Sequence, residues 1–309
     1  MSMNQISNRW KEYEVLDAGD KTKLERWKKI ILDRPDPVAI WPKESPSLWK
    51  KADAVYHRSS KGGGSWEFKK PLEEFWTIRY GELLFKISPT GFKHTGLFPE
   101  QAANWDFIMN SIRAAKADGR ENIKVLNLFA YTGGATMAAA KAGADEVVHL
   151  DASKGINQWA RENMELNHLE DRKIRFLVDD VMKFIRREIR RGRKYDAIVM
   201  DPPSYGRGPN GEVWKIEDSI YELISEASRL LSDQALFFLV NIYSTGFPLS
   251  SLQQTMDKTL LKEHGGSVEV GETLLPITSG GVLPCGQFGR WTSDWLNSHL
   301  PAATENEDL

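Results

Sequence analysis

Three acidic segments and a pair of glycines stand at regular intervals in the middle of the chain. Asp151, the pair Asp179 and Asp180, and Asp201 each end an apolar run, and the glycine pair beginning at Gly133 follows an earlier run. Glycines let a backbone approach a ligand closely, and carboxylates accept hydrogen bonds from hydroxyl and amino groups. These residue types in this order suit the binding of a nucleoside, whose ribose and base present such groups.

The elements that must position these residues follow from apolar periodicity. Nearly continuous apolar runs predict buried parallel strands over residues 124–130, 146–152, 173–180, 195–201 and 235–242. Helices are predicted over residues 134–142, 153–167, 181–191, 217–231 and 249–262. Their alternation predicts an open α/β sheet with ligands at the carboxyl ends of the strands. Two further runs, over residues 267–274 and 287–293, predict an antiparallel pair that completes the sheet.

The first part of the chain has a different character, rich in proline and tryptophan. A helical pattern over residues 21–32 precedes several prolines, and residues 76–87 alternate around a glycine as a hairpin does. We expect a small α+β domain over residues 1–95, a candidate for substrate binding, and a catalytic domain over residues 96–300. The acidic tail, residues 301–309, is expected to be disordered.

The glycine turn favours one class of nucleoside cofactor over another. The segment NLFAYTGG, residues 127–134, lacks the G-x-G-x-x-G spacing that cradles a pyrophosphate, which argues against a nicotinamide-dependent reductase. S-adenosyl-L-methionine has no phosphates and needs a close turn for its methionine part and carboxylates for its ribose and adenine. Asp151 is placed for the ribose and Asp201 for the end where the methyl group is presented. Each aspartate taken singly could instead cap a helix.

The ordered motifs NLFAYTGG, HLDAS, LVDDV and VMDPPSYG resemble those of bacterial 23S ribosomal RNA methyltransferases that make 5-methylcytosine or 7-methylguanine. The resemblance covers roughly residues 91–291 and implies a Rossmann-like, seven-stranded class I methyltransferase sheet that binds S-adenosyl-L-methionine. It implies cofactor contacts from Asn127, Phe129, Thr132, Gly133, Asp151, Asp180 and Asp201. Further candidates are Ala130, Tyr131, Ala152, Ser153 and Asp179 in the same motifs, and Phe98 and Gln101 in the segment that closes over the cofactor in this family.

The type of methyl transfer depends on cysteine. Methylation of a pyrimidine C5 needs a thiolate adduct, which the resembling cytosine enzymes form with a cysteine after the fifth strand. Residues 240–245 contain none here, and the one cysteine, Cys285, lies before the last strand, where an inert buried thiol is expected. Nitrogen methylation needs only orientation and an acceptor. The candidate catalytic residues, with Asp201 as acceptor and Tyr205 as a stacking platform or simply a loop aromatic, are Asp201, Pro202, Pro203 and Tyr205.

Composition sets the remaining expectations. A single cysteine excludes an internal disulfide, the scattered histidines predict no metal site, and no apolar run is long enough to span a membrane, so a cytoplasmic protein is expected. The net charge of −2 leaves any case for RNA to a local patch. Such a patch is one basic face of the predicted helix over residues 181–191, which a solvated helix surface explains equally well.

We therefore predict an S-adenosyl-L-methionine-dependent methyltransferase that acts on a base of structured, ribosomal RNA by direct transfer without a cysteine adduct. A methyltransferase of a protein or small molecule, or a non-catalytic cofactor-binding assembly factor, remains an alternative. The oligomeric state is left open.

Overall fold

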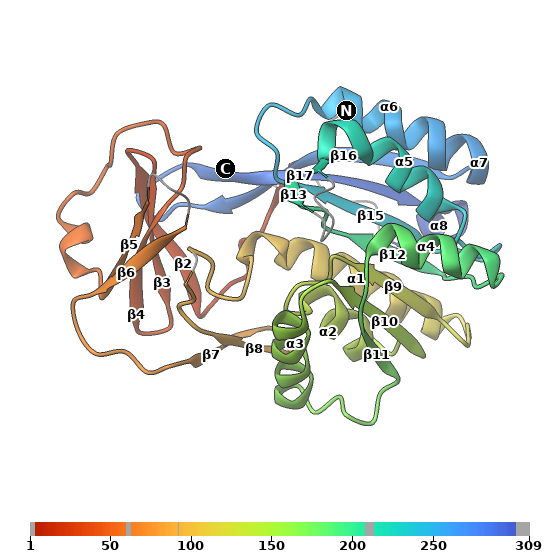
Figure 1. The fold of residues 1–309 in the computed structure, drawn as a ribbon, viewed down its shortest axis with the longest axis horizontal. Coiled ribbons are helices and arrows are strands. Elements are labelled where there is room, and N and C mark those ends of the chain that lie inside the picture. The colour runs from red at the N-terminus through yellow and green to blue at the C-terminus, as the bar shows by residue number, and fades with distance from the viewer. Residues whose placement is uncertain (1–3, 60–62, 92, 208–212, 301–309) are drawn as a thin grey trace.

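The computed structural model describes residues 4–59, 63–91, 93–207 and 213–300, and a mixed eight-stranded sheet forms its larger part (Figure 1). The strand order is β1-β16-β17-β15-β12-β9-β10-β11. The strands span Gln5–Ile6 (β1), Ser267–Pro276 (β16), Val282–Thr292 (β17), Phe237–Ile242 (β15), Ala197–Met200 (β12), Lys124–Leu128 (β9), Glu146–Asp151 (β10) and Ile174–Val178 (β11). All seven expected strands are present, the expected antiparallel pair is confirmed as β16 and β17, and β1 adds an eighth strand parallel to β16.

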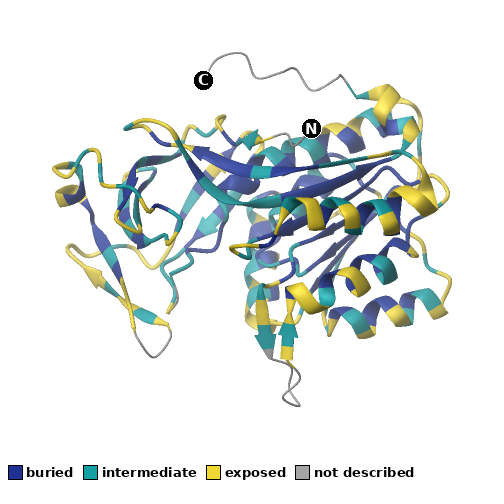
Figure 2. Cartoon of the chain, turned by 90° about the horizontal axis from the view of Figure 1, so that it is seen from above, coloured by how far each residue is buried: buried dark blue, intermediate teal, exposed yellow. Residues whose placement is uncertain are grey.

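Helices cover both faces of this sheet because its central strands are apolar on both sides. Val125 and Val147 face one core, with α1 and α2, whereas Leu126 and Val148 face a second core, with α4 and α5. Figure 2 shows these strands as buried and the outer helix faces as exposed. The helices are α1 (Ala102–Ala117), α2 (Gly134–Lys141), α3 (Lys154–Leu166), α4 (Val181–Arg190), α5 (Ile216–Ser228), α6 (Leu249–Met256), α7 (Lys262–His264) and α8 (Asp294–His299), with a π-helical turn, Asp257–Leu261, between α6 and α7.

The predicted helix over residues 21–32 is wrong, because this segment forms the hairpin of β3 (Thr22–Trp27) and β4 (Ile30–Pro35). Positive φ angles at Asp20, Lys21 and Lys28 (50°, 63° and 54°) make the two tight turns that bound β3. The apolar spacing of this segment fits a helix and a strand alike. Pairing with β2 (Tyr13–Gly19) decides the outcome, and that pairing is a tertiary contact.

The amino-terminal part is a five-stranded sheet, β2-β3-β4-β5-β6, with β5 spanning Ala54–Arg58 and β6 Gly64–Phe68. Its one helical element among the described residues is the 3-10 turn η1 (Leu48–Lys51). The β16–β17 hairpin extends from the large sheet to this smaller one, where the Thr278 amide donates to the Val15 carbonyl at 2.8 Å (Figure 1). The domain boundary at residue 95 stays a prediction, and the tail over residues 301–309 lies outside the described residues.

A β-hairpin and the segment that follows it connect the small sheet to the large one. The expected hairpin over residues 76–87 is confirmed as β7 (Trp76–Tyr80) and β8 (Leu83–Ile87), and β8 is held on α3 by Asn163. The segment that follows is fastened to the small sheet, because the Arg34 guanidinium donates to the Lys93 carbonyl at 2.8 Å. It then forms the 3-10 turn η2 (Pro99–Gln101) and enters α1. Residues 93–101 therefore lie between the two sheets.

Candidate functional site

The turn between β9 and α2 has an unusual backbone. Phe129, Tyr131 and Gly133 have φ angles of 54°, 49° and 89°, so three alternate residues are left-handed. Non-glycine residues rarely adopt this region, and such strain gathers at functional sites. Neighbouring groups hold it: the Ala130 amide donates to the Leu150 carbonyl at 3.0 Å, and the Tyr131 amide donates to Asp151 Oδ2 at 3.0 Å. The turn is thus fixed by the strand next to it.

Replacing Gly133 with alanine should destabilise the protein by about 1–2 kcal/mol, the cost of a left-handed non-glycine residue. An added Cβ would also lie 3.1 Å from Met137 Cε. Urea denaturation of Gly133→Ala measures the effect. The matched control is Gly155→Ala on α3, where a Cβ would meet nothing within 4 Å and the helix should gain slightly. Equal stabilities of the two variants would contradict this account of the turn.

A buried polar chain supports the turn from below. Asn127 donates to Thr136 Oγ1 at 2.9 Å, and Thr136 Oγ1 lies 2.9 Å from His149 Nδ1. Burial lowers the pKa of His149 to about 3, so the ring is neutral. Thr132 Oγ1 donates to the Gly96 carbonyl at 2.6 Å, which ties the turn to residues 93–101. Asn127 and Thr132 therefore have hydrogen-bond partners within the protein.

A pocket opens above this turn at the carboxyl ends of β9, β12 and β15. It brings together eight of the predicted site residues: Phe98, Gln101, Asn127, Phe129, Ala130, Tyr131, Thr132 and Asp201. Gly134, the second glycine of the predicted turn, also lines it. Sequence reasoning missed the others: Leu97, Asn104, Trp105, Ile108, Ala135, Val199, Leu239 and Asn241. A signal existed for Asn241, a polar residue within the apolar run of β15, as Asn127 is in β9. For Asn104 and Trp105 the helix α1 had first to be recognised.

One wall of the pocket is a buried amide network. Gln101 Nε2 donates to the Tyr243 hydroxyl at 2.6 Å, and Gln101 Oε1 accepts from Asn104 Nδ2 at 2.9 Å. Asn104 Nδ2 also donates to Asn241 Oδ1 at 3.0 Å. Phe98 packs between Tyr131 and Tyr243, with ring centroids 5.2 and 5.6 Å away. Aromatic rings and amides together suit a ligand with apolar and polar parts.

The acidic residues predicted for ribose and adenine lie at the neighbouring strand ends, outside the residues that line the pocket. Asp151 is oriented by two amides, since Ser153 N donates to its Oδ1 at 2.9 Å and Tyr131 N to its Oδ2. Asp180 caps α4 by accepting from the Lys183 amide at 2.8 Å, and Asp179 forms an ion pair with Arg187 at 2.6 Å. Ser153 caps α3, next to the exposed Ala152. As for Gly133, the cofactor contacts of these residues stay predictions: Asp151, Ala152, Ser153, Asp179 and Asp180.

The candidate catalytic residues divide between the pocket and its rim. Asp201 lines the pocket and is partly buried. Burial raises its pKa to about 8, and the nearby Glu100 carboxyl adds to the rise. Pro202 is buried, whereas Pro203 and Tyr205 are exposed and lie outside the lining residues. The roles of all four stay predictions.

An aromatic residue that sequence reasoning passed over lies beside the candidate catalytic segment. Trp214 Nε1 donates to the Pro203 carbonyl at 2.7 Å, and the Trp214 ring packs 6.2 Å from that of Phe129. It belongs to β14 (Val213–Lys215), which pairs with β13 (Tyr205–Arg207). Trp214 therefore joins the candidate catalytic segment to the turn between β9 and α2.

The remaining expectations concern cysteine, metal and membrane. Cys285 lies on β17 outside the pocket lining, its thiol donates to the Leu283 carbonyl at 3.4 Å, and burial raises its pKa. Among the described residues, no three His, Cys, Asp or Glu side chains gather as a metal ion requires. No described helix has the length and apolar character needed to cross a membrane.

The residues present fit S-adenosylmethionine. The turn with left-handed residues brings backbone to the pocket, which Phe129, Ala130, Tyr131 and Thr132 line. Asp151 is a carboxylate already oriented for ribose hydroxyls, and the pocket supplies amides and aromatic rings. The turn and the pocket would then hold the methionine part, and Asp151 the ribose.

Comparison with known proteins agrees with this fit. The sequence model of S-adenosylmethionine-dependent methyltransferases matches residues 51–231. The ribosomal RNA large subunit methyltransferase K/L of Syntrophotalea carbinolica is 31% identical over 185 residues, 60% of this chain and 24% of that protein. The ribosomal RNA large subunit methyltransferase I of Shigella dysenteriae is 47% identical over 85 residues, 28% of this chain and 21% of that protein. The chain thus spans about a quarter of the length of these curated relatives.

Solved structures extend the likeness to nearly the whole chain. The crystal structure of the SAM-dependent methyltransferase from Agrobacterium tumefaciens is 36% identical, with a TM-score of 0.88 over 94% of each chain. SMU.776, crystallised with S-adenosylhomocysteine (SAH), has a TM-score of 0.72 at 18% identity, over 92% of this chain and 76% of its own. At that identity the second match shows the fold alone.

Proposed function

The chain belongs to the family of S-adenosylmethionine-dependent methyltransferases, and from this premise we propose that it methylates a base of structured ribosomal RNA. The observation that carries the proposal is Asp201, a partly buried carboxyl group at the cofactor pocket in the segment VMDPPSYG. The names of the curated relatives, ribosomal RNA large subunit methyltransferases, support RNA as the methyl acceptor. A cytoplasmic location is part of the same proposal.

The chemistry is a direct transfer. The bound cofactor supplies an electrophilic methyl group on a positively charged sulfur. Asp151, oriented by the Tyr131 amide, would hold the ribose, and the turn with the aromatic rings of Phe98 and Tyr131 would hold the methionine end. Positioning of this kind removes much of the barrier to transfer. Asp201, ionised once a cationic ligand lies beside it, accepts the hydrogen bond or proton of the attacking nitrogen.

Transfer without a cysteine adduct is supported by the state of Cys285. Its partly buried thiol, with a raised pKa, is a poor source of thiolate, and it lies outside the pocket lining. Tyr205, 53% exposed at the rim, is offered as a stacking surface for a base turned out of the RNA.

The test uses cofactor with a labelled methyl group, an unmodified transcript of 23S ribosomal RNA, and separate fractions of cellular protein and small metabolites. We expect label in the RNA, and we expect Cys285→Ser to retain at least half of the wild-type rate. Label in the protein or metabolite fraction alone would identify a different acceptor. A loss of activity in a folded Cys285→Ser protein would refute direct transfer, and no label in any fraction would favour a non-catalytic assembly factor.

A further inference from the structure

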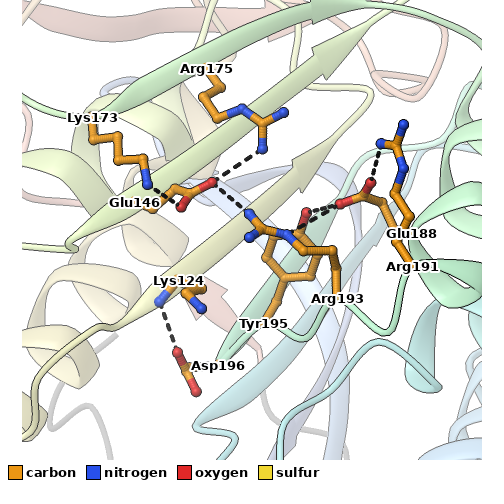
Figure 3. A network of polar contacts seen from close by, with 9 residues as sticks. All are labelled: Lys124, Glu146, Lys173, Arg175, Glu188, Arg191, Arg193, Tyr195 and Asp196. Atoms are coloured by element: carbon orange, nitrogen blue, oxygen red, sulfur yellow. Dashed lines mark hydrogen bonds and ion pairs between the residues drawn. The ribbon is translucent and has the colours of Figure 1, made fainter.

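A cluster of four cations and two carboxylates lies at the amino ends of the strands, at the sheet edge opposite the cofactor pocket (Figure 3). Glu146 begins β10, Lys173 immediately precedes β11, and Arg175 is the second residue of β11. Glu188, Arg191 and Arg193 come from the end of α4 and the loop after it. These six residues line an open hollow of about 370 Å³, which we call the basic hollow.

The two carboxylates are buried and already paired. Glu146 is 4% exposed and lies 2.7 Å from Lys173 Nζ, 3.2 Å from Arg175 Nη1 and 2.9 Å from Arg193 Nη2. Burial alone would raise its pKa, but these three cations hold that pKa below its ordinary value. Glu188, 3% exposed, accepts from Arg191 at 3.1 Å and from the Tyr195 hydroxyl at 2.8 Å. Both carboxylates therefore accept hydrogen bonds inside the cluster.

The cations outnumber the carboxylates and lie nearer to the solvent. Four positive and two negative groups leave a charge of +2 in the hollow. The side chains of Lys173 and Arg191 are 64% and 58% exposed, and that of Arg175 is 40% exposed. Arg175 and Arg191 each reach their carboxylate through one terminal nitrogen, Nη1, while a guanidinium offers five N–H donors. The hollow thus presents donors and net positive charge outward.

The rest of the predicted basic face of α4 differs from this cluster. Arg186 pairs with Glu222 at 2.7 Å and Arg187 with Asp179 at 2.6 Å, so each of these cations is matched by one carboxylate. Lys194 donates to the Arg229 carbonyl at 2.8 Å. Arg191 is the member of that face that joins the hollow. Arg186 and Arg187 are thus paired one to one, whereas the hollow holds four cations and two carboxylates.

From this arrangement we infer that the basic hollow binds phosphates of the RNA substrate at a second contact, remote from the edge where the methyl group is transferred. The inference rests on the proposed function. Forked guanidinium donors match phosphate oxygens. The large apolar side chains that are exposed among the described residues all lie outside the hollow, whereas protein interfaces are anchored by such groups.

The spacing of the two contacts defines the kind of RNA. Glu146 and Asp151 stand at opposite ends of β10, five residues apart, which is about 17 Å at the usual rise of a strand. A single nucleotide at the transfer edge cannot reach the hollow. A folded RNA can contact both, which agrees with a structured substrate.

The experiment measures binding of the 23S transcript between about 50 and 250 mM salt by wild type and by Lys173→Gln with Arg191→Gln. These two cations are the most exposed, and each carboxylate keeps Arg193 as a neighbour. We expect about tenfold weaker binding, a salt slope smaller by about 1.5, and a raised KM with an unchanged kcat. The control is Arg113→Gln with Lys116→Gln on α1, which removes the same charge from one-to-one ion pairs with Glu82 and Asp145.

The outcomes separate the two proposals. If wild type binds and methylates the transcript and the hollow variant does so with the same affinity and slope, the inference falls and the proposed function stands. An equal loss in the control variant would likewise overturn the inference, since the effect would then reflect net charge alone. If wild type neither retains nor methylates the transcript while it binds the cofactor, the RNA proposal and the inference fall together.

Discussion

Replacing Asp201 with asparagine will lower the rate of methyl transfer by about 100-fold or more and will stabilise the folded protein at alkaline pH. The two effects share one cause. Asp201 is partly buried, and its pKa is raised to about 8 by that burial and by the nearby Glu100. Asparagine has the shape of the neutral acid but cannot accept a proton. The substitution therefore raises the stability of the folded state at alkaline pH and lowers the rate of methyl transfer.

The pH dependence of stability follows from the same shift. Asp201 has a folded pKa of about 8 and an unfolded value near 4, so the folded state binds more protons between these two values. Its favourable contribution is complete below pH 4 and is lost as the pH rises to about 8. The stability advantage of Asp201→Asn should therefore grow from near zero at pH 4 to a few kcal/mol at pH 9, as urea denaturation would measure.

Binding of the cationic cofactor should lower the pKa of Asp201, the opposite of the effect of burial. A positive charge beside the carboxyl favours ionisation, so wild type should release a proton on binding at pH 7, and its affinity should rise with pH up to about 8. Calorimetry in buffers of different ionisation enthalpy counts that proton. Asp201→Asn should release no proton. In Glu100→Gln the pH at which the cofactor affinity is half-maximal should be lower than in wild type, because Glu100 raises the pKa of Asp201. A flat affinity profile for wild type would refute a coupled, protonated Asp201.

The second large effect concerns the cofactor itself. Asp151→Ala should weaken binding of S-adenosylmethionine by about 100-fold, because charged hydrogen bonds to ribose hydroxyls contribute roughly 1.5–3 kcal/mol each. Two backbone amides hold this carboxylate in place before any ligand arrives, so little ordering is needed on binding. Calorimetric titration measures the loss, with NADH as the comparison ligand.

Two variants separate a ribose contact from a general loosening of the site. Asp180→Ser keeps a side chain that can cap α4 while it removes the neighbouring carboxylate, so it tests the predicted adenine contact on an intact helix. Asp151→Asn keeps one oxygen as an acceptor for the Tyr131 or the Ser153 amide and removes the negative charge, so it tests the charge with less change to the turn. A folded Asp151→Ala protein with wild-type affinity, or a protein that prefers NADH, would overturn the assignment of the ribose site.

The local pattern of the sequence was sufficient to predict the strands of the large sheet and the order of the polar residues at their carboxyl ends. Buried parallel strands leave nearly continuous apolar runs, and their carboxyl ends must meet at one edge, so Asp151 and Asp201 could be placed at that edge without coordinates. The resemblance of the segment NLFAYTGG, which begins within β9, implied Asn127, Phe129 and Thr132, and these residues line the pocket.

The amino-terminal hairpin shows where local pattern is insufficient. Residues 22–35 carry apolar spacing that suits a helix or a strand, and pairing of β3 with both β2 and β4 selects the strand. Long-range pairing overrides intrinsic preference in such ambiguous segments.

The rest of the site was decided by tertiary structure, because its contacts join residues far apart in the chain. Gln101 meets Tyr243, 142 positions away, and Asn104 meets Asn241, 137 positions away. Arg193 reaches Glu146 across 47 positions to complete the basic hollow. Periodicity reports which side of an element is buried, and it carries no information about which distant side chains share that interior. The sequence by itself determined the parallel sheet and the edge that holds the cofactor; only the folded chain decided the amide wall of the pocket, the raised pKa of Asp201 and the gathering of four cations at the opposite edge.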